Sequence, residues 1–150
     1  MTLQFDRATE ADLPALIALL SDDVLGAGRE GLDEQAVYAR AFAQIQCDPN
    51  QFLCVAKDRD HVVGTLQLSF VQGLSRRGAR RGLIEAVRVA SDRRGQGVGQ
   101  AMMEWAIAEC RRQGCALVQL TTDRSRTDAH RFYDRLGFTA SHVGYKLALD

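Results

Sequence analysis

Six consecutive residues combine an arginine with three glycines, between a β-branched segment at residues 87–89 and the start of an amphipathic segment. They are Arg94, Gly95, Gln96, Gly97, Val98 and Gly99. In such a strand–loop–helix arrangement, unsatisfied N–H groups and the helix dipole favour a phosphate at the helix N-terminus. Glycine also lets the backbone approach that phosphate, because it has no Cβ. The segment therefore predicts a loop that holds a pyrophosphate.

The order of residues in this loop distinguishes several kinds of phosphate site. A P-loop requires Lys followed by Ser or Thr after its last glycine, but Gln100 follows Gly99 here. A dinucleotide-binding fingerprint has the spacing GxGxxG and an acidic residue about 20 positions later. Here the spacing is GxGxG, with an arginine directly before it. Neither pattern is met, which leaves Arg-x-x-Gly-x-Gly between a strand and a helix.

A second motif lies downstream, and it reads Asp128-Ala129-His130-Arg131-Phe132-Tyr133-Asp134-Arg135-Leu136-Gly137-Phe138. It resembles the Ala-x-x-apolar-Tyr-x-x-Leu-Gly-Phe helix end of the GNAT N-acetyltransferase superfamily. The Arg-x-x-Gly-x-Gly pattern resembles the acetyl-CoA loop of the same superfamily, and the two motifs stand in the superfamily's order. The close resemblance runs from about residue 84 to residue 138. The first half of the chain matches only in the order of its expected elements.

The resemblance implies that the chain binds acetyl-CoA as a co-substrate, and we expect no metal. It implies that the strand at residues 87–89 splays from the strand at residues 117–121. Backbone groups of Val87 and Val89, with Arg88 between them, would then bind the pantetheine and the thioester carbonyl. Backbone N–H donors directed at a developing oxyanion are a large catalytic term.

Glu85 is the candidate general base. It has the same parity as Val87 and Val89, so strand alternation would place all three on one face. A carboxylate in an otherwise apolar strand is expected either to be paired with another group or to have a function. Enzymes that this chain resembles often carry Glu at this position. Two alternatives stay open: Glu85 could be paired with Arg80 or Arg81, or the amine could bind already deprotonated.

Tyr133 is the candidate general acid, because it matches the tyrosine of the second motif. A tyrosine phenol ordinarily titrates near pH ~10, so it stays protonated at pH 7 and can donate to a leaving thiolate. The alternative is an amphipathic tyrosine packed in the core with its hydroxyl at the rim.

Residues around the second motif give further candidates for cofactor binding. Arg126 stands where many relatives carry Asn, three residues before the motif alanine Ala129. Arg126 or Arg131 could therefore meet a phosphate of CoA, or lie on a solvated helix surface. His130 is a weaker candidate for a second base.

The acceptor site carries no motif. A basic segment at residues 76–81 could line a site for an acidic amine or form a solvated turn. Residues 121–133 and the pair Ser141-His142 are similar to the corresponding stretch of aminoalkylphosphonate N-acetyltransferases, which suggests such an acceptor. The similarity lies in the cofactor half of the chain.

These residues have to be positioned by a mixed α/β fold with a mostly antiparallel sheet flanked by helices. Apolar periodicity and turn residues predict the order βααβββαβαββ, which is the order of the GNAT fold. The elements are expected at residues 3–5, 13–20, 33–46, 52–57, 61–70, 83–89, 98–113, 117–121, 128–136 and, as a closing hairpin, 138–149.

Length and composition indicate one globular domain over residues 1–150. The formal net charge of zero argues against a nucleic-acid or membrane partner. No apolar run approaches the ~18 residues needed to span a bilayer, and no signal peptide is visible, so we expect a cytoplasmic protein. Four scattered cysteines without zinc spacing are expected to be reduced. A homodimer is expected only by analogy with relatives.

Together these features predict an acetyl-CoA-dependent N-acetyltransferase that acts on the primary amine of a small molecule. No cysteine lies within the motifs, which favours direct attack in a ternary complex over a covalent enzyme intermediate. A protein or peptide N-acetyltransferase is the first alternative, and it would need an open groove at residues 26–31. The second is a non-catalytic acyl-CoA-binding sensor module, which Glu85 and Tyr133 disfavour.

Overall fold

The computed structural model describes residues 1–22, 30 and 34–150, which divide into two compact units, residues 1–119 and 120–150. Of the predicted break at residues 26–31, only Glu30 belongs to the described residues. Within the part of the chain that is described, no helix has both the length and the hydropathy that crossing a membrane requires.

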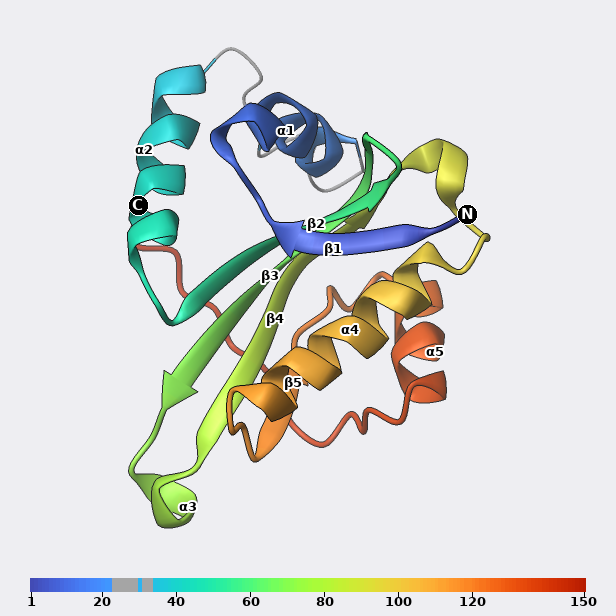
Figure 1. Ribbon diagram of the computed structural model, residues 1–150. Helices are drawn as coiled ribbons and strands as arrows, with labels where there is room; N and C mark the ends of the chain where they lie inside the picture. The colour runs from blue at the N-terminus through green and yellow to red at the C-terminus, as the bar shows by residue number, and fades with distance from the viewer. Residues whose placement is uncertain (23–29, 31–33) are drawn as a thin grey trace. The chain divides into compact units, whose positions relative to one another are not determined.

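A five-stranded sheet forms the centre of the first unit, with its strands in the order β1-β2-β3-β4-β5 (Figure 1). The pairs β1–β2, β2–β3 and β3–β4 are all antiparallel. The strands are β1 (Leu3–Arg7), β2 (Gln51–Asp58), β3 (His61–Gln72), β4 (Arg80–Val89) and β5 (Leu117–Leu120), the last of which ends at the boundary between the units. The sheet confirms the expected mixed, mostly antiparallel class.

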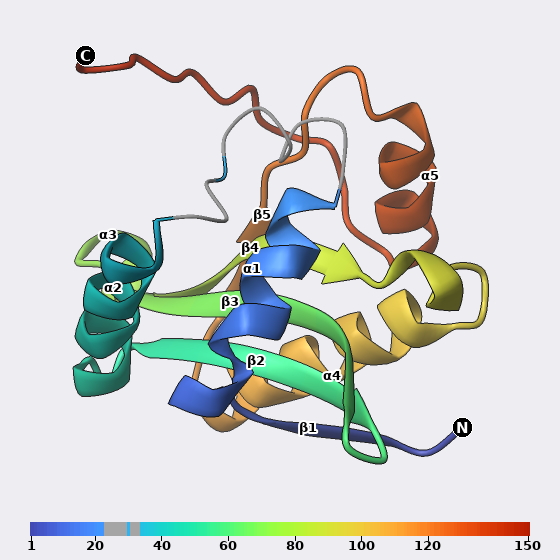
Figure 2. The same cartoon turned by 90° about the horizontal axis from the view of Figure 1, so that it is seen from above.

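Helices cover both faces of this sheet (Figure 2). One face carries α1 (Leu13–Ser21) and α2 (Gln35–Cys47), and the other carries α4 (Val98–Arg112). Because side chains alternate along each strand, the two faces have separate cores. On the α1–α2 side, buried Leu16 and Phe42 pack with Val55 of β2.

The α4 side of the sheet has a deeply buried core of its own. Met102 and Met103 of α4 are essentially fully buried, as is Leu66 of β3. The Trp105 ring stacks on Phe5 with a centroid separation of 5.7 Å and meets Phe52 edge-on at 5.0 Å. These contacts fix α4 against the sheet, and α4 in turn fixes the loop that precedes it.

Short turns complete the first unit. They are η1 (Glu10–Asp12), α3 (Ser75–Gly78) and η3 (Ser91–Arg93). At η1, the Asp12 carboxylate accepts hydrogen bonds from the backbone N–H of Thr9 (2.8 Å) and from its hydroxyl (3.2 Å). The same carboxylate lies 3.1 Å from the ammonium of Lys57, so this turn is anchored to β2.

The second unit contains one helix, α5 (Thr127–Arg135). It ends at the Leu-Gly-Phe part of the second motif, where Gly137 has a left-handed φ of +95°. The N–H of Phe138 then donates to the carbonyl of Tyr133 (3.1 Å). A glycine in this conformation is a common way to terminate an α-helix, so the glycine of the motif serves to end α5.

The predicted C-terminal hairpin is wrong. Residues 139–150 contain no strand, and among the described residues their only backbone hydrogen bond joins the N–H of Ser141 to the carbonyl of Thr139. A strand requires a neighbour to satisfy its backbone groups, and a period-two side-chain pattern does not provide one. The observed order of the longer elements is therefore βααβββαβα.

Candidate active site

The predicted phosphate loop leads from η3 into α4. Gly95 and Gly97 have φ values of +76° and +84°, which side chains with a Cβ rarely adopt. Apart from the adjacent residues in the chain, no heavy atom of the described residues lies within 4 Å of where a Cβ would stand at either glycine. Within the described residues, the N–H groups of residues 95–99 have no hydrogen-bond acceptor. The loop therefore presents donors and open space at a helix N-terminus, which fits an anion such as a pyrophosphate.

Contacts on both sides hold this loop in place. Val98, the first residue of α4, is only 1% exposed. Before the loop, the Arg93 guanidinium lies 2.6 Å from the Asp58 carboxylate at the end of β2, and its hydrogen bond and charge lower the pKa of Asp58. The Arg94 side chain donates to the backbone carbonyl of Asp22 (3.2 Å). The loop is thus tied to β2 and to the end of α1.

A β-bulge interrupts β4 next to the candidate base. Gln67 of β3 pairs with Glu85, and Thr65 pairs with Arg88. One residue of β3 therefore opposes two residues of β4, the arrangement that defines a bulge. Ala86, inside the bulge, has a left-handed φ of +53°.

The bulge changes which side chains share a face. Glu85 and Arg88 lie on the same face as their partners Gln67 and Thr65, whereas Val89 pairs with Gly64 on the opposite face. The prediction that Glu85 and Val89 share a face is therefore wrong. The physical reason is that an inserted residue inverts the alternation for every position that follows it.

Glu85 is an exposed side chain. The two arginines considered as its partners bind elsewhere: Arg80 donates to Asn50 Oδ1 at 2.9 Å. Arg81 donates to Gln119 Oε1 at 3.1 Å. In the described part of the chain, none of the salt bridges contains Glu85. Its carboxylate is therefore accessible from solvent and belongs to no salt bridge among the described residues.

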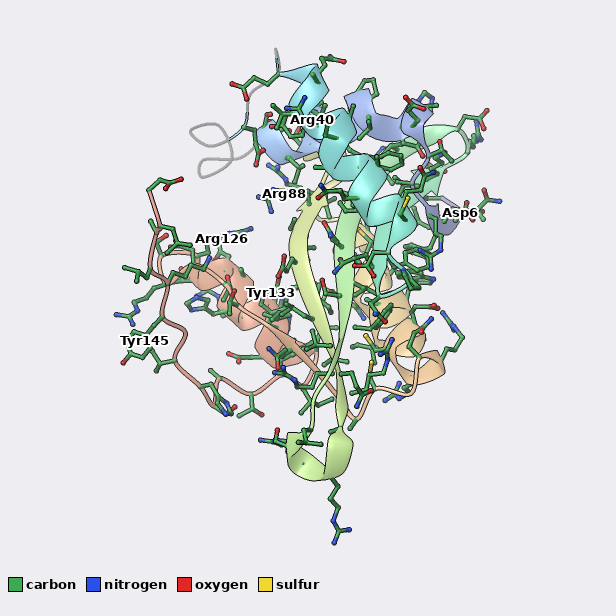
Figure 3. All side chains as sticks on the ribbon, turned by 90° about the vertical axis from the view of Figure 1, so that its left-hand side faces the viewer. Asp6, Arg40, Arg88, Arg126, Tyr133 and Tyr145 are labelled. Carbon is green, nitrogen blue, oxygen red and sulfur yellow. The ribbon has the colours of Figure 1, made fainter. Side chains whose placement is uncertain are left out.

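Arg88 lies beside the end of β4, on the side where α1 and α2 pack (Figure 3). Its Nη1 donates to the carbonyl of Val87 at 3.0 Å, and its Nε is buried. The face of β4 that meets α1 and α2 thus carries a carboxylate and a guanidinium, separated by the bulge.

A cavity of about 100 Å³ opens on the same face of the sheet. Its walls come from α1, α2, β3 and the bulge residue Ala86, and most of its lining side chains are apolar. Thr65 and Gln67, the strand partners of Arg88 and Glu85, also line it. Sequence analysis did not predict this cavity, because no local pattern of residues indicates the bulge or the distance between the helices and the sheet.

The basic segment at residues 76–81 lies away from this cavity. Arg76 and Arg77 are exposed in α3, at the tip of the β3–β4 hairpin (Figure 1). Arg80 and Arg81 belong to β4 itself. Arg80 lies five positions before Glu85, about 17 Å at the rise of an extended strand.

The second unit holds the remaining candidates. Tyr133 is half-buried in α5, and its ring meets Phe132 and Phe138 with centroid separations of 5.2 and 6.0 Å. Arg126 is exposed directly before α5, and Ala129 is half-buried in its first turn. His130 Nε2 lies 3.0 Å from the carbonyl of Asp123, so this ring closes the turn before the helix.

All four cysteines are free thiols. Burial raises the pKa of Cys54 and of Cys110 to about 12, which keeps both protonated at neutral pH. Burial also raises the pKa of Cys115. Cys47 is exposed. A protonated thiol is a poor nucleophile, so Cys54 and Cys110 are unsuited to carrying an acyl group.

Comparison with known proteins agrees with this geometry. The sequence model of the acetyltransferase (GNAT) family matches residues 12–138. The aminoalkylphosphonate N-acetyltransferase of Salmonella typhimurium is 34% identical over 143 residues, which are 95% of this chain and 89% of that protein.

Solved structures show the same fold. A Bacillus halodurans protein described as a transcriptional regulator superposes with a TM-score of 0.95 at 44% identity, over 99% of this chain and 100% of that one. A Clostridium acetobutylicum protein, described as a predicted acetyltransferase with acetyl-CoA, superposes with a TM-score of 0.77 at 16% identity, over 99% and 97% of the two chains. The second likeness concerns the fold alone.

The chain therefore belongs to the GNAT family of acetyltransferases. It is an acyltransferase of the kind that uses acetyl-CoA. The loop at the start of α4 presents backbone N–H donors and open space among the described residues.

Proposed function

We propose that this protein transfers an acetyl group from acetyl-CoA to the primary amine of a small molecule, by direct attack in a ternary complex. The observation that carries the proposal is the Glu85 carboxylate, exposed and outside any salt bridge of the described residues, next to the bulge residue that lines an apolar cavity. Such a carboxylate can accept a proton from an ammonium group, directly or through one water.

In the proposed reaction, Glu85 takes a proton from the acceptor ammonium and leaves an uncharged amine. The amine nitrogen attacks the thioester carbonyl carbon, so a C–N bond forms and the C–S bond breaks. Backbone N–H groups of Val87 and Val89 stabilise the negative charge on the carbonyl oxygen. The sulfur leaves with the electron pair of the C–S bond, and Tyr133 donates its phenolic proton to it. The attacking nitrogen loses its second proton to become the amide, and this proton restores the Tyr133 phenol.

The proposed cofactor contacts follow the two motifs. Arg94, Gly95, Gln96, Gly97, Val98 and Gly99 hold the pyrophosphate, and the unbonded amides of this loop support that role. Arg88, with the valines on either side of it, contributes backbone groups to the pantetheine. Arg126 and Ala129, in the second unit, provide the contacts near α5 that the family resemblance implies.

We propose further that the acceptor is a small amine that carries an acidic group. The apolar lining of the cavity suits a short hydrocarbon segment. Arg88 lies on the same face of β4 as Glu85, so one acceptor can meet a carboxylate and a guanidinium. A relative with 34% identity is an aminoalkylphosphonate N-acetyltransferase, which is an enzyme for such an amine.

The two units are proposed to act as one acetyltransferase domain in the cytoplasm, since the family match spans both. A non-catalytic acyl-CoA-binding module is a rival function, because the relative with 44% identity is described as a transcriptional regulator. A peptide acceptor is a second rival, and it would need an open groove at residues 26–31, of which only Glu30 belongs to the described residues.

The test is a mass-spectrometric search for acetylated products with purified protein and acetyl-CoA. The acceptors are 2-aminoethylphosphonate, ethylamine as its analogue without the acid, and a short peptide. We expect acetylated 2-aminoethylphosphonate, with kcat/KM at least about tenfold above that for ethylamine. Arg88→Met should lower that ratio towards one, while turnover of ethylamine persists.

Other outcomes would redirect the proposal. Equal rates with both amines would contradict the role of Arg88 and leave a general amine acetyltransferase. Product from the peptide alone would identify a protein acetyltransferase. Binding of acetyl-CoA without any product would favour the non-catalytic module.

A further inference from the structure

Three uncharged polar side chains form a group on the face of the sheet that carries the apolar cavity. They are Gln51, the first residue of β2, and Gln67 and Ser69 of β3. Gln51 pairs with Ser69 in the β2–β3 register, and Gln67 precedes Ser69 by two positions, so all three side chains point to one face. Gln67 lines the cavity, which identifies this face as the one beside α1 and α2.

Two hydrogen bonds converge on the side chain of Gln51. Its Oε1 accepts from Gln67 Nε2 at 2.9 Å and from the Ser69 hydroxyl at 2.9 Å. All three side chains are half-buried, so water competes less for these bonds than it does on an open surface. Two donors use both lone pairs of the Gln51 oxygen. Gln51 is thus the acceptor in this group, and Gln67 is a donor.

The bond to Gln51 determines where the Gln67 carbonyl oxygen points. The nitrogen and the oxygen of a side-chain amide diverge from one planar carbon, and β3 lies between β2 and β4. Because the nitrogen is held towards β2, the oxygen is turned towards β4. The residue paired with Gln67 on β4 is Glu85, and the Cβ atoms of such a pair are about 4.5–5.5 Å apart.

The Gln67 oxygen is available to a ligand. Among the described residues no hydrogen bond reaches it, and it is not one of the buried side-chain atoms that lack a partner. The atom therefore has access to solvent, as does the exposed carboxylate of Glu85. Two neighbouring oxygen acceptors, one neutral and one negatively charged, suit a cation with several N–H donors, and an ammonium group has three.

We propose that Gln67 binds the ammonium group of the acceptor amine together with Glu85, and that Gln51 and Ser69 position its amide for this contact. The inference rests on the proposed function. One N–H of the ammonium meets the Glu85 carboxylate and a second meets Gln67 Oε1. When Glu85 removes its proton, the N–H on Gln67 stays in place, so the new lone pair keeps a fixed direction towards the thioester. Gln67 itself exchanges no proton and forms no covalent bond.

The first experiment compares the steady-state kinetics of Gln67→Met with those of the wild type. Methionine has a similar length and lacks the amide oxygen. We expect kcat/KM to fall by about 10–100-fold, the effect of losing a hydrogen bond to a charged group. The fall should be equal for 2-aminoethylphosphonate and for ethylamine, because both carry the same ammonium group. The Kd for acetyl-CoA should not change.

Gln72→Met is the matched control for this substitution. Gln72 belongs to the same strand, is exposed, and donates to the backbone carbonyls of Gly73 and Gly78 at the tip of the β3–β4 hairpin. The control therefore also loses side-chain hydrogen bonds, but away from the cavity. It should keep the wild-type kcat/KM for both amines.

Substitutions of Gln51 test the positioning role and do not alter Gln67 itself. Gln51→Leu removes the acceptor that holds the Gln67 amide, and we expect kcat/KM to fall by about tenfold. Gln51→Glu keeps an acceptor for both hydrogen bonds and should restore most of the activity. A side chain that only filled space would show no such rescue. This pair also carries the test if Gln67→Met fails to fold, which its melting temperature would reveal.

The outcomes separate this inference from the proposed function. Wild-type kinetics in Gln67→Met would overturn the role of Gln67 and leave the acetyltransferase intact. A fall confined to 2-aminoethylphosphonate would also overturn it, because Gln67 would then act on the acidic end of the acceptor. Equal losses in Gln51→Leu and Gln51→Glu would overturn the positioning role. If the wild type acetylates no amine at all, the proposed function fails, and the inference fails with it.

Discussion

Glu85 and Arg88 lie on one face of β4 because the bulge at Ala86 places two residues opposite one residue of β3. In a regular strand, residues three apart point to opposite faces. The bulge therefore puts a carboxylate and a guanidinium on the side that faces α1, α2 and their apolar cavity. The two groups differ in role: we assign proton transfer to Glu85 and recognition of the acceptor to Arg88.

Replacement of Glu85 should remove the general base. For Glu85→Gln we expect kcat to fall by about 10²–10⁴-fold, with little change in acetyl-CoA affinity or melting temperature, because the side chain is exposed. Glu104→Gln, an exposed carboxylate on α4, serves as the control and should keep full activity. Steady-state kinetics with a titrated amine checks this, and wild-type turnover by Glu85→Gln would mean that the amine binds already deprotonated.

Tyr133→Phe should affect the chemical step and spare cofactor binding. The variant keeps the ring that packs against Phe132 and Phe138 and loses the phenolic hydroxyl, which is the proposed proton donor. We expect kcat to fall by about ten- to a thousandfold, while the Kd for acetyl-CoA measured by calorimetry stays nearly constant. Tyr145→Phe removes a phenol from a 94% exposed position and should change neither quantity. Unchanged turnover in Tyr133→Phe would exclude this residue from the mechanism.

Gly97→Ala separates backbone strain from phosphate binding. Gly97 and Gly114 have similar left-handed φ values, +84° and +76°, and open space around a Cβ. Alanine at either position should cost about 1–2 kcal/mol of stability. Only Gly97→Ala should also raise the Kd for acetyl-CoA, by tenfold or more, because its Cβ enters the space proposed for the pyrophosphate. If Gly114→Ala weakens binding equally, the effect is global and the loop assignment is wrong.

The Asp12 carboxylate should make stability depend on pH. Burial alone would raise its pKa, but the Thr9 N–H and the Lys57 ammonium lower it overall. A lowered pKa in the folded state gives stability that is present above about pH 4 and lost as the pH falls through the folded value. At pH 7, Asp12→Asn should destabilise the fold by about 1–3 kcal/mol.

Urea unfolding over a pH series from 7 to 3.5 checks the Asp12 prediction. The difference in the free energy of unfolding between the wild type and Asp12→Asn should become smaller as the pH falls. Asp128→Asn serves as the control, since the Asp128 side chain is 93% exposed. Its free energy of unfolding should differ little from that of the wild type at every pH. A gap that stays constant with pH would show that the charge of Asp12 is not responsible.

Sequence alone was sufficient for the glycine-containing turn before α4 and for most element boundaries. The positive φ of Gly95 and Gly97, the start of α4 at Val98 and the end of α5 near Gly137 are local properties. They depend on which residues carry a Cβ and on periodicity over a few turns. The two motifs and their order sufficed for the family, which the match over residues 12–138 confirms.

Tertiary structure alone decided the position of the bulge, the cavity and the conformation of residues 139–150. The register of β4 depends on its pairing with β3, so the alternation expected for Val89 failed even though the strand itself was predicted. The cavity exists because α1 and α2 pack at a particular distance from the sheet. Residues 139–150 have the side-chain alternation of a strand but form none. The reason is that the backbone hydrogen bonds of a strand require a neighbouring segment, which a side-chain pattern does not supply.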